Sequence, residues 1–291
     1  MADPFLSLAI ITYQSEKTVA ETLASLENLK ELETVELILF DDASRDATRE
    51  LVSKWVDKNR KLFHSVQTIF SDRNLGISRA HTRAFAEAKG VWGTYLGGDD
   101  LLRSPSRDFF LKLKTALQDV KEHLVRLRVK EYWSETGTII DYFDSYSFLI
   151  RLSARRQYRY LASSGYPFRS GPGTVFRLDT LRALDGFGTY NLAFEDWQLY
   201  LRFTRNGYRA GFLDLEGVLW RRHPGQVSAT GAQKFALGNA LVKRKEIIPY
   251  LDRLSLFERW KFRFRGRISS RLHVYYQKYL GLWGRLFGVR R

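Results

Sequence analysis

Residues 35–42 have the sequence VELILFDD, in which a short apolar run ends in two aspartates. An apolar run of this length is typical of a strand that is buried on both faces of a parallel sheet. Comparable runs occur at 6–12, 65–70 and 91–96. Helical patterns fill the intervals, at about 17–29, 44–59 and 79–89. This alternation predicts an α/β fold in which a mostly parallel sheet is flanked by helices.

The rest of the chain follows a different rhythm. Helices are predicted over 108–121 and 194–206, and strands over 171–176 and within 208–220. Residues 124–165 mix apolar, aromatic and basic side chains without an assignable period, and the pattern is helical from about residue 232 to the end. We therefore expect one domain over 1–230, divided at about residue 103, and a helical extension over 231–291.

The composition excludes several chemistries. The chain has 291 residues and no cysteine, which rules out disulfides, cysteine nucleophiles and thiolate zinc sites. There is no run of about 18 apolar residues and no leader-like N-terminus, so neither a transmembrane helix nor a signal peptide is expected. The net charge is +15, and residues 256–291 contribute +9 of it, from ten basic residues and one glutamate. The positive charge is thus concentrated near the C-terminal end.

Paired acids follow two of the predicted strands. One strand is followed by Asp41-Asp42, and another by Asp99-Asp100 after two glycines. Because the carboxyl ends of parallel strands meet at one edge of a sheet, we expect these side chains to gather there. Oxygen-rich sites of this kind suit Mg²⁺ or Mn²⁺, which bridge carboxylates to substrate phosphates. The alternative is that each pair starts a turn or caps the next helix.

Two further groups come later in the chain. Glu195 and Asp196 begin a predicted helix, where a carboxylate could act as a general base, although the helix dipole alone favours acids in a first turn. Arg221, Arg222 and His223 precede a proline–glycine turn. They could bind an anion or complete a metal shell, or form a basic surface loop. The sequence has no Walker loop, no Gly-x-Gly-x-x-Gly and no Gly-x-Ser-x-Gly elbow.

Four segments in chain order resemble the inverting, GT-A-fold family 2 glycosyltransferases of the bacterial surface-glycan type. The segments are LSLAIITYQSEKTVAETLASL (6–26), VELILFDDASRDATRELV (35–52), DRNLGISRAHTRAFAEAKGVWGTYLGGDDLL (72–102) and FEDWQLYLRFTRNGYRAGFL (194–213). Each segment alone is a loose match, whereas the ordered set is specific and covers most of residues 5–215. The resemblance implies that 1–230 is a GT-A catalytic domain, with a nucleotide-sugar half before about residue 103 and an acceptor half after it.

The resemblance also implies roles for individual residues. Those that would line the nucleotide-sugar pocket are Thr12, Tyr13, Glu16, Asp41, Asp72, Arg73, Asn74 and Asp99. Asp41 would hold the base, and Asp42 would support its loop. The divalent cation, Mn²⁺ or Mg²⁺, would be held on the diphosphate by Asp99, Asp100 and His223. Asp196 would be the catalytic base. Glu195, Trp197 and Arg222 would contact the acceptor or support the residues that contact it.

The sequence departs from the family pattern at two positions. Gly97 stands where the family often has the first aspartate of Asp-x-Asp-Asp, so the direct metal ligand could be Asp99, Asp100 or both. Thr82 stands where the family commonly has asparagine, which affects the detail of the nucleotide contacts.

The function implied is a metal-dependent, inverting transfer of a sugar from a nucleoside diphosphate sugar, with UDP as the expected nucleotide. The acceptor would be a hydroxyl of a glycan or of a lipid-linked saccharide. One alternative is a catalytically silent nucleotide-sugar- or membrane-binding protein of the same fold. Another is a nucleotidyltransferase, but such an enzyme usually has a glycine-rich basic loop after its first strand, and TYQSEKT (12–18) is not one.

Residues 256–291 interleave basic and aromatic side chains. A basic aromatic amphipathic helix binds well to an anionic bilayer, which predicts a cytoplasmic protein attached peripherally to the inner face of the cell membrane. The alternative is a helical pair that packs on the catalytic domain or on a second subunit, giving a homo-oligomer. A nucleic-acid partner is not expected, because no helix-turn-helix, zinc or RNA-recognition signature is present.

Overall fold

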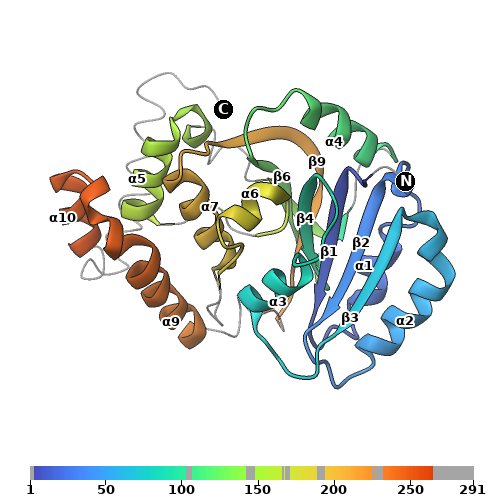
Figure 1. Ribbon diagram of the computed structural model, residues 1–291. Coiled ribbons are helices and arrows are strands. Elements are labelled where there is room, and N and C mark those ends of the chain that lie inside the picture. Colours follow the sequence, from blue (N-terminus) through green and yellow to red (C-terminus); the bar gives the residue numbers. More distant parts are fainter. Residues whose placement is uncertain are drawn as a thin grey trace.

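The computed structural model describes residues 3–102, 107–141, 148–165, 167, 171–188, 194–224, 226 and 232–264. Within these residues, a curled nine-stranded sheet has helices on both faces, and further helices extend the fold on one side (Figure 1). This mixed α/β architecture confirms the fold class predicted from the sequence.

The first hundred residues alternate strand and helix as expected. Their elements are β1 (Leu6–Thr12), α1 (Val19–Ala24), η1 (Leu32–Thr34), β2 (Val35–Asp41), α2 (Thr48–Asn59), η2 (Arg60–Leu62), β3 (Ser65–Phe70), α3 (Ile77–Ala84), β4 (Trp92–Gly97) and β5 (Leu101–Leu102). β1 pairs in parallel with β2 and β4, and β2 pairs in parallel with β3. Every residue of β2 is buried, as its apolar run predicted.

The second part contains both parallel and antiparallel pairs. Its elements are α4 (Phe109–Gln118), β6 (Leu124–Trp133), β7 (Thr138–Asp141), η4 (Leu149–Arg151), α5 (Ala154–Ser164), β8 (Thr174–Arg177), α6 (Leu178–Ala183), α7 (Glu195–Arg205) and β9 (Ala210–Arg222). β8 lies between β4 and β6 and is antiparallel to both. β6 therefore runs in the same direction as β4, and it pairs in parallel with β9. The carboxyl ends of β1, β2, β4, β6 and β9 thus lie at one edge of the sheet.

Helices cover both faces of the sheet (Figure 1), and a hydrophobic core lies on each side of it. One lies under α1, α2 and α4 and includes Val52 and Phe110. The other lies under α3, α5, α6 and α7, and it includes Ile247 and Leu254. The C-terminal helices are α9 (Ala232–Val242), η5 (Lys243–Ile247), η6 (Ile248–Arg253) and α10 (Leu256–Phe264). The described part of the C-terminal extension therefore packs into the second core.

Segment 124–165, which has no assignable sequence period, forms β6, β7 and α5. The basic residues of β6 obscured its pattern because the fold provides partners for them. Arg126 donates to the backbone carbonyls of Gly171 and Pro172 at 3.2 and 2.7 Å, and Lys130 pairs with Glu216. Charged side chains can therefore occupy a central strand here without remaining unpaired.

Two predicted boundaries also differ from the structure. α3 ends at Ala84 rather than near residue 89, because the chain turns to bring Gly90 against β1. A Cβ on Gly90 would lie 2.5 Å from the backbone nitrogen of Ser7. The one or two strands predicted within 208–220 form a single strand, β9, and its register with β6 shifts near Glu216, where the sequence suggested a break.

The predicted C-terminal helix is divided into α9, η5, η6 and α10, and residues 265–291 lie outside the described part of the chain. Among the described residues, no helix is both long and apolar enough to span a bilayer.

Candidate active site

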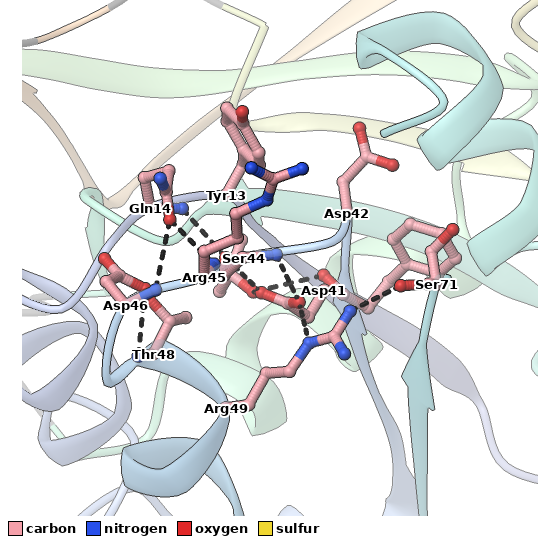
Figure 2. A network of polar contacts seen from close by, with 12 residues as sticks. Tyr13, Gln14, Asp41, Asp42, Ser44, Arg45, Asp46, Thr48, Arg49 and Ser71 are labelled. Atoms are coloured by element: carbon pink, nitrogen blue, oxygen red, sulfur yellow. Dashed lines mark hydrogen bonds and ion pairs between the residues drawn. The ribbon is translucent and has the colours of Figure 1, made fainter. Parts of the chain in front are cut away.

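Asp41 ends β2, and its carboxylate is turned into the protein (Figure 2). It accepts hydrogen bonds from Thr12 Oγ1 at 3.0 Å, from Ser44 N at 2.9 Å and Oγ at 2.5 Å, and from Arg49 Nε at 2.6 Å. The residue is 1% exposed. These hydrogen bonds connect β1, β2 and α2, so Asp41 fixes the loop between β2 and α2.

The Asp42 side chain points away from Asp41 (Figure 2), and it binds the loop that precedes α3. Its carboxylate accepts the N–H groups of Leu75 and Gly76 at 2.6 and 2.9 Å, immediately before α3. Burial raises the pKa of Asp42, and these two N–H donors oppose that effect. The first acidic pair therefore organises two loops, as the turn alternative expected, and its carboxylates do not converge on a common point.

The loop after β1 forms one wall of this edge. Gln14 Oε1 accepts the N–H of Arg45 at 2.9 Å, and Glu16 Oε2 accepts the N–H of Ala47 at 3.2 Å. Tyr13 is half exposed. Asp72, Arg73 and Asn74 follow β3 and are exposed at the same edge of the sheet. These residues form a polar surface next to the carboxyl ends of β1, β2 and β3, and the exposed Tyr13 ring lies within it.

The second acidic pair divides into a buried and an accessible member. Asp100 Oδ2 accepts the N–H of Gly97, and its Oδ1 accepts the N–H of Arg221, both at 3.1 Å. Burial, followed by the neighbouring charge of Asp99, raises the pKa of Asp100 well above its usual value. The Asp99 side chain is 34% exposed, and its Oδ2 lies 3.1 Å from His223 Nε2.

Gly97 explains how both carboxylates fit at this position. A Cβ there would lie 2.5 Å from Asp99 Oδ1 and 3.0 Å from Asp100 Oδ2. The departure from Asp-x-Asp-Asp therefore leaves room for the two acids to fold back over the strand end. Arg221 holds this arrangement by donating to the carbonyl of Asp99 at 2.6 Å and to Glu21 at 2.7 Å.

A divalent cation would find a partial ligand set here. Among the described residues, no three His, Cys, Asp or Glu side chains form a ready-made metal centre. Asp99 and His223 are nevertheless adjacent, and the Asp99 side chain is partly exposed. Mg²⁺ commonly takes one or two protein carboxylates and completes its shell with substrate phosphates and water. The residues present therefore fit a cation that binds together with a diphosphate.

Glu195 and Asp196 begin α7, close to the carboxyl end of β4. Asp196 is buried, and its Oδ1 accepts the N–H of Trp197 at 2.7 Å in the first helical turn. Burial, followed by the charge of Asp196, raises the pKa of Glu195 to about 8. Both carboxylates also raise the pKa of Tyr95, after the larger effect of burial, so they lie near this residue of β4.

Trp197 lies behind these acids rather than beside solvent. Its ring is buried in the second core, and its Nε1 donates to the carbonyl of Leu161 in α5. Arg222, at the end of β9, pairs with Glu131 at 3.0 Å and has its guanidinium near two tryptophan rings.

Sequence reasoning missed two groups that support this edge. Tyr95 approaches Glu195 because the intervening residue is Gly171, where a Cβ would lie 2.4 Å from Tyr95 Oη and 3.1 Å from Glu195 Oε1. Glu246 binds Arg202 and Arg205 of α7 at 2.7 and 3.0 Å. A lone glutamate in the basic run KRKEI was the only sequence signal for the second group.

The fold and the strand-edge acids define a GT-A-type transferase architecture. Residues 7–179 match the model of glycosyl transferase family 2, and the chain belongs to this family. The predicted family resemblance is therefore confirmed.

Relatives with assigned names include a UDP-Glc:α-D-GlcNAc-diphosphoundecaprenol β-1,3-glucosyltransferase, WfaP, of Escherichia coli. It is 24% identical over 77% of this chain and 80% of its own length. A cholesterol galactosyltransferase of Borreliella burgdorferi is 31% identical over 34% of this chain. That match spans only 26% of the relative.

Solved structures share the fold at low sequence identity. Staphylococcus aureus TarS (1–349) with UDP-GlcNAc has a TM-score of 0.61 and 19% identity, covering 78% of this chain and 61% of TarS. The mannosyltransferase PcManGT of Pyrobaculum calidifontis, with GDP-Man and Mn²⁺, has a TM-score of 0.61 and 18% identity. That match covers 97% of this chain and 81% of PcManGT.

Proposed function

We propose that this protein is an inverting, metal-dependent glycosyltransferase that moves a sugar from a nucleoside diphosphate sugar, with UDP as the nucleotide, to an acceptor hydroxyl. The observation that carries the proposal is the meeting of β4 and α7. β4 leads into Asp99, which touches His223, and Tyr95 on the same strand lies beside the acids that begin α7. On this proposal, the base and the acid that faces the diphosphate share one sheet edge.

The donor nucleotide would occupy the wall formed by the ends of β1, β2 and β3. Tyr13 offers an exposed ring to a base, and Thr12, Glu16 and Asp72–Asn74 line the same edge. The internal bonds of Asp41 indicate that it shapes the base pocket by fixing the β2–α2 loop. The nucleotide sugars bound in the TarS and PcManGT structures support this class of donor.

The diphosphate would lie against Asp99 and His223, with Asp100 holding the backbone beneath them. Mn²⁺ or Mg²⁺ held there would neutralise charge on the leaving diphosphate. Arg221 restrains the same loop through its bond to the Asp99 carbonyl.

Asp196 would act as the general base. The Trp197 N–H donates to its Oδ1, and the raised pKa of Glu195 keeps that neighbouring carboxyl mostly protonated at neutral pH. The acceptor oxygen bonds to the anomeric carbon from the face opposite the diphosphate, and the hydroxyl proton passes to Asp196. The bond between the anomeric carbon and the diphosphate breaks, and the nucleoside diphosphate leaves with its electrons. The configuration at the anomeric carbon is therefore inverted in one step.

An Asp196→Asn variant tests this assignment against the catalytically silent alternative. Nucleoside diphosphate sugars are first screened for thermal stabilisation with Mn²⁺, and the best donor is used to measure nucleoside diphosphate release with a bacterial lipid extract. Wild type should turn over, whereas the variant should lose at least about 100-fold in rate while binding the donor normally. Stabilisation without turnover in wild type would favour the silent alternative.

The acceptor would be a glycan or a lipid-linked saccharide at an anionic membrane surface. α10 presents Leu256, Phe257 and Trp260 with exposed fractions of 82%, 70% and 54%. Exposed basic residues accompany them, namely Arg244, Lys245, Arg253, Arg259 and Arg263. Apolar and basic side chains together match the acyl boundary and headgroups of an anionic bilayer. The diphosphoundecaprenol and cholesterol in the names of two relatives support a membrane-borne acceptor.

A further inference from the structure

We propose that Trp133, Trp220 and the Arg222–Glu131 pair form a binding platform for a neutral pyranose of the acceptor. The proposal rests on the proposed function and extends it to the acceptor side of the same edge. Four observations support it: the position of the platform, the way it is held, its exposure and its net charge.

The platform begins next to the diphosphate-facing residues. Trp133 and Arg222 are register partners at the carboxyl ends of β6 and β9. These ends lie at the same sheet edge as Asp99, and His223, which touches Asp99, directly follows Arg222. In the strand order β3-β2-β1-β4-β8-β6-β9-β5, the nucleotide wall lies on the β1 side of β4. The platform lies on the other side, where an acceptor would approach.

The central arginine is held in place. Arg222 Nε lies 3.0 Å from Glu131 Oε1, and the arginine guanidinium carbon is 4.6 Å from the Trp220 ring centre and 5.4 Å from that of Trp133. Ser134 donates from both its backbone nitrogen and its hydroxyl to the carbonyl of Arg222. The guanidinium plane and the two rings are therefore fixed relative to one another before any ligand binds.

The platform offers both apolar and polar groups to a ligand. Trp133 is 40% exposed, and it lies on the same face of the sheet as Glu131, two residues earlier on β6. Glu131 is buried, and its Oε2 has no hydrogen-bond partner within the described part of the chain. Because this oxygen is inaccessible to a ligand, Glu131 contributes by pairing with Arg222, whose side chain is 23% exposed beside the Trp133 ring.

This combination matches a sugar better than an anion. A pyranose presents an apolar face of C–H groups and an edge of hydroxyls, which suit an aromatic ring and a carboxylate–guanidinium pair respectively. Glu131 neutralises Arg222, so the pair offers no net positive charge to a phosphate. The geometry therefore favours an uncharged saccharide unit.

The test compares the binding of free saccharides with the binding of UDP. Cellobiose, maltose, lactose and chitobiose are titrated into the full-length protein with UDP and Mn²⁺ by calorimetry and saturation-transfer NMR. Wild type should bind at least one of them saturably. Trp133→Ala should weaken that binding about 3- to 10-fold, whereas Trp133→Phe should retain most of it. Leu111→Ala, which removes a similarly exposed side chain on α4, should change nothing.

Thermal stabilisation by UDP and Mn²⁺ separates this proposal from the proposed function. Trp133→Ala should keep wild-type stabilisation, which also shows that the variant is folded. The platform is refuted if no disaccharide binds wild type, or if Trp133→Ala binds as well as wild type. Failure of UDP and Mn²⁺ to stabilise wild type would instead contradict the donor site.

Discussion

Four aspartates follow the strands at this edge, and their environments separate them by role. Asp41 and Asp42 accept loop N–H groups, Asp100 accepts two backbone N–H groups, and Asp99 faces solvent beside His223. Sequence spacing predicted that the acid pairs would follow two strands of one sheet at the same edge, and they do. Their division into structural and accessible carboxylates depends on the backbone of Ser44, Leu75 and Arg221, which no local pattern encodes.

We predict that Asp99→Asn weakens Mn²⁺-dependent UDP binding at least about tenfold with little effect on the melting temperature, because its carboxylate is accessible. Asp100→Asn should instead destabilise the fold by about 1–3 kcal/mol, because an amide has one accepting oxygen and one of the two buried N–H groups would lose its acceptor. Calorimetric titration with and without Mn²⁺ and denaturant unfolding check both effects. Wild-type UDP affinity in Asp99→Asn would place the cation elsewhere.

A pH effect should follow from Glu195. Its pKa is raised from the usual 4.5 to about 8, so between these values the folded state holds a proton that the unfolded chain has released. The contribution of Glu195 to stability is therefore fully present below about pH 4.5 and is lost as the pH rises through about 8. Glu195→Gln keeps a neutral side chain throughout, so its advantage in melting temperature over wild type should grow from pH 6 to pH 9. A constant difference across this range would contradict the raised pKa.

At the scale of elements, α7 is fixed from behind by the C-terminal extension. Glu246 of η5 accepts from Arg202 and Arg205, and the Arg205 guanidinium lies 3.9 Å from the Tyr250 ring centre. Arg202 also donates to the carbonyl of Asp185, in the chain that precedes α7. The helix that begins with Glu195 and Asp196 is therefore positioned by residues about fifty positions later in the sequence.

Replacing the buried Glu246 should strongly destabilise the fold. Glu246→Gln should lower the free energy of unfolding by about 3 kcal/mol or more, because two buried guanidinium groups lose their counter-charge. Glu122→Gln, which breaks a more exposed pair with Arg209, is the matched control and should cost at most about 1 kcal/mol. Urea unfolding measures both, and equal losses would argue against a special role for Glu246.

Local patterns predicted β1 and β3 to the residue, because apolar runs bounded by polar loops suffice for buried parallel strands. They did not predict that β8 would enter the sheet antiparallel, because its partners β4 and β6 are distant in sequence. They also left β6 unassigned, since Arg126 and Lys130 find partners only in the folded chain.

At the scale of the whole molecule, α10 should orient the protein on a membrane. The helix is anchored to α5 by Glu258, which pairs with Arg159 at 2.7 Å, and by Lys261, which donates to Ser164 at 2.8 Å. Its exposed side chains are thus presented by a fixed element. A docked α10 would hold the catalytic domain at a defined orientation to lipid-linked acceptors.

We predict that wild type floats with vesicles of phosphatidylglycerol and phosphatidylcholine, less so with phosphatidylcholine alone or at high salt. Phe257→Ser combined with Trp260→Ser should abolish most of the flotation, whereas Leu111→Ser should not. A chain ending at residue 264 tests how much binding α10 supports by itself.

Unchanged flotation of the double variant would remove α10 from the interface. Light scattering tests the competing homo-oligomer. A dimer that the double variant dissociates, with no vesicle binding by wild type, would make the same face a subunit contact.

Among the described residues, two strand pairs connect the segment before about residue 103 to the segment after it. β5, at residues 101–102, pairs with β9, and β8 pairs with β4. A chimaera that exchanged the residues before about 103 with those of a relative would have to preserve both strand pairs at once. Recombination within this family should therefore succeed more readily by replacing whole domains or single loops than by crossing over near residue 103.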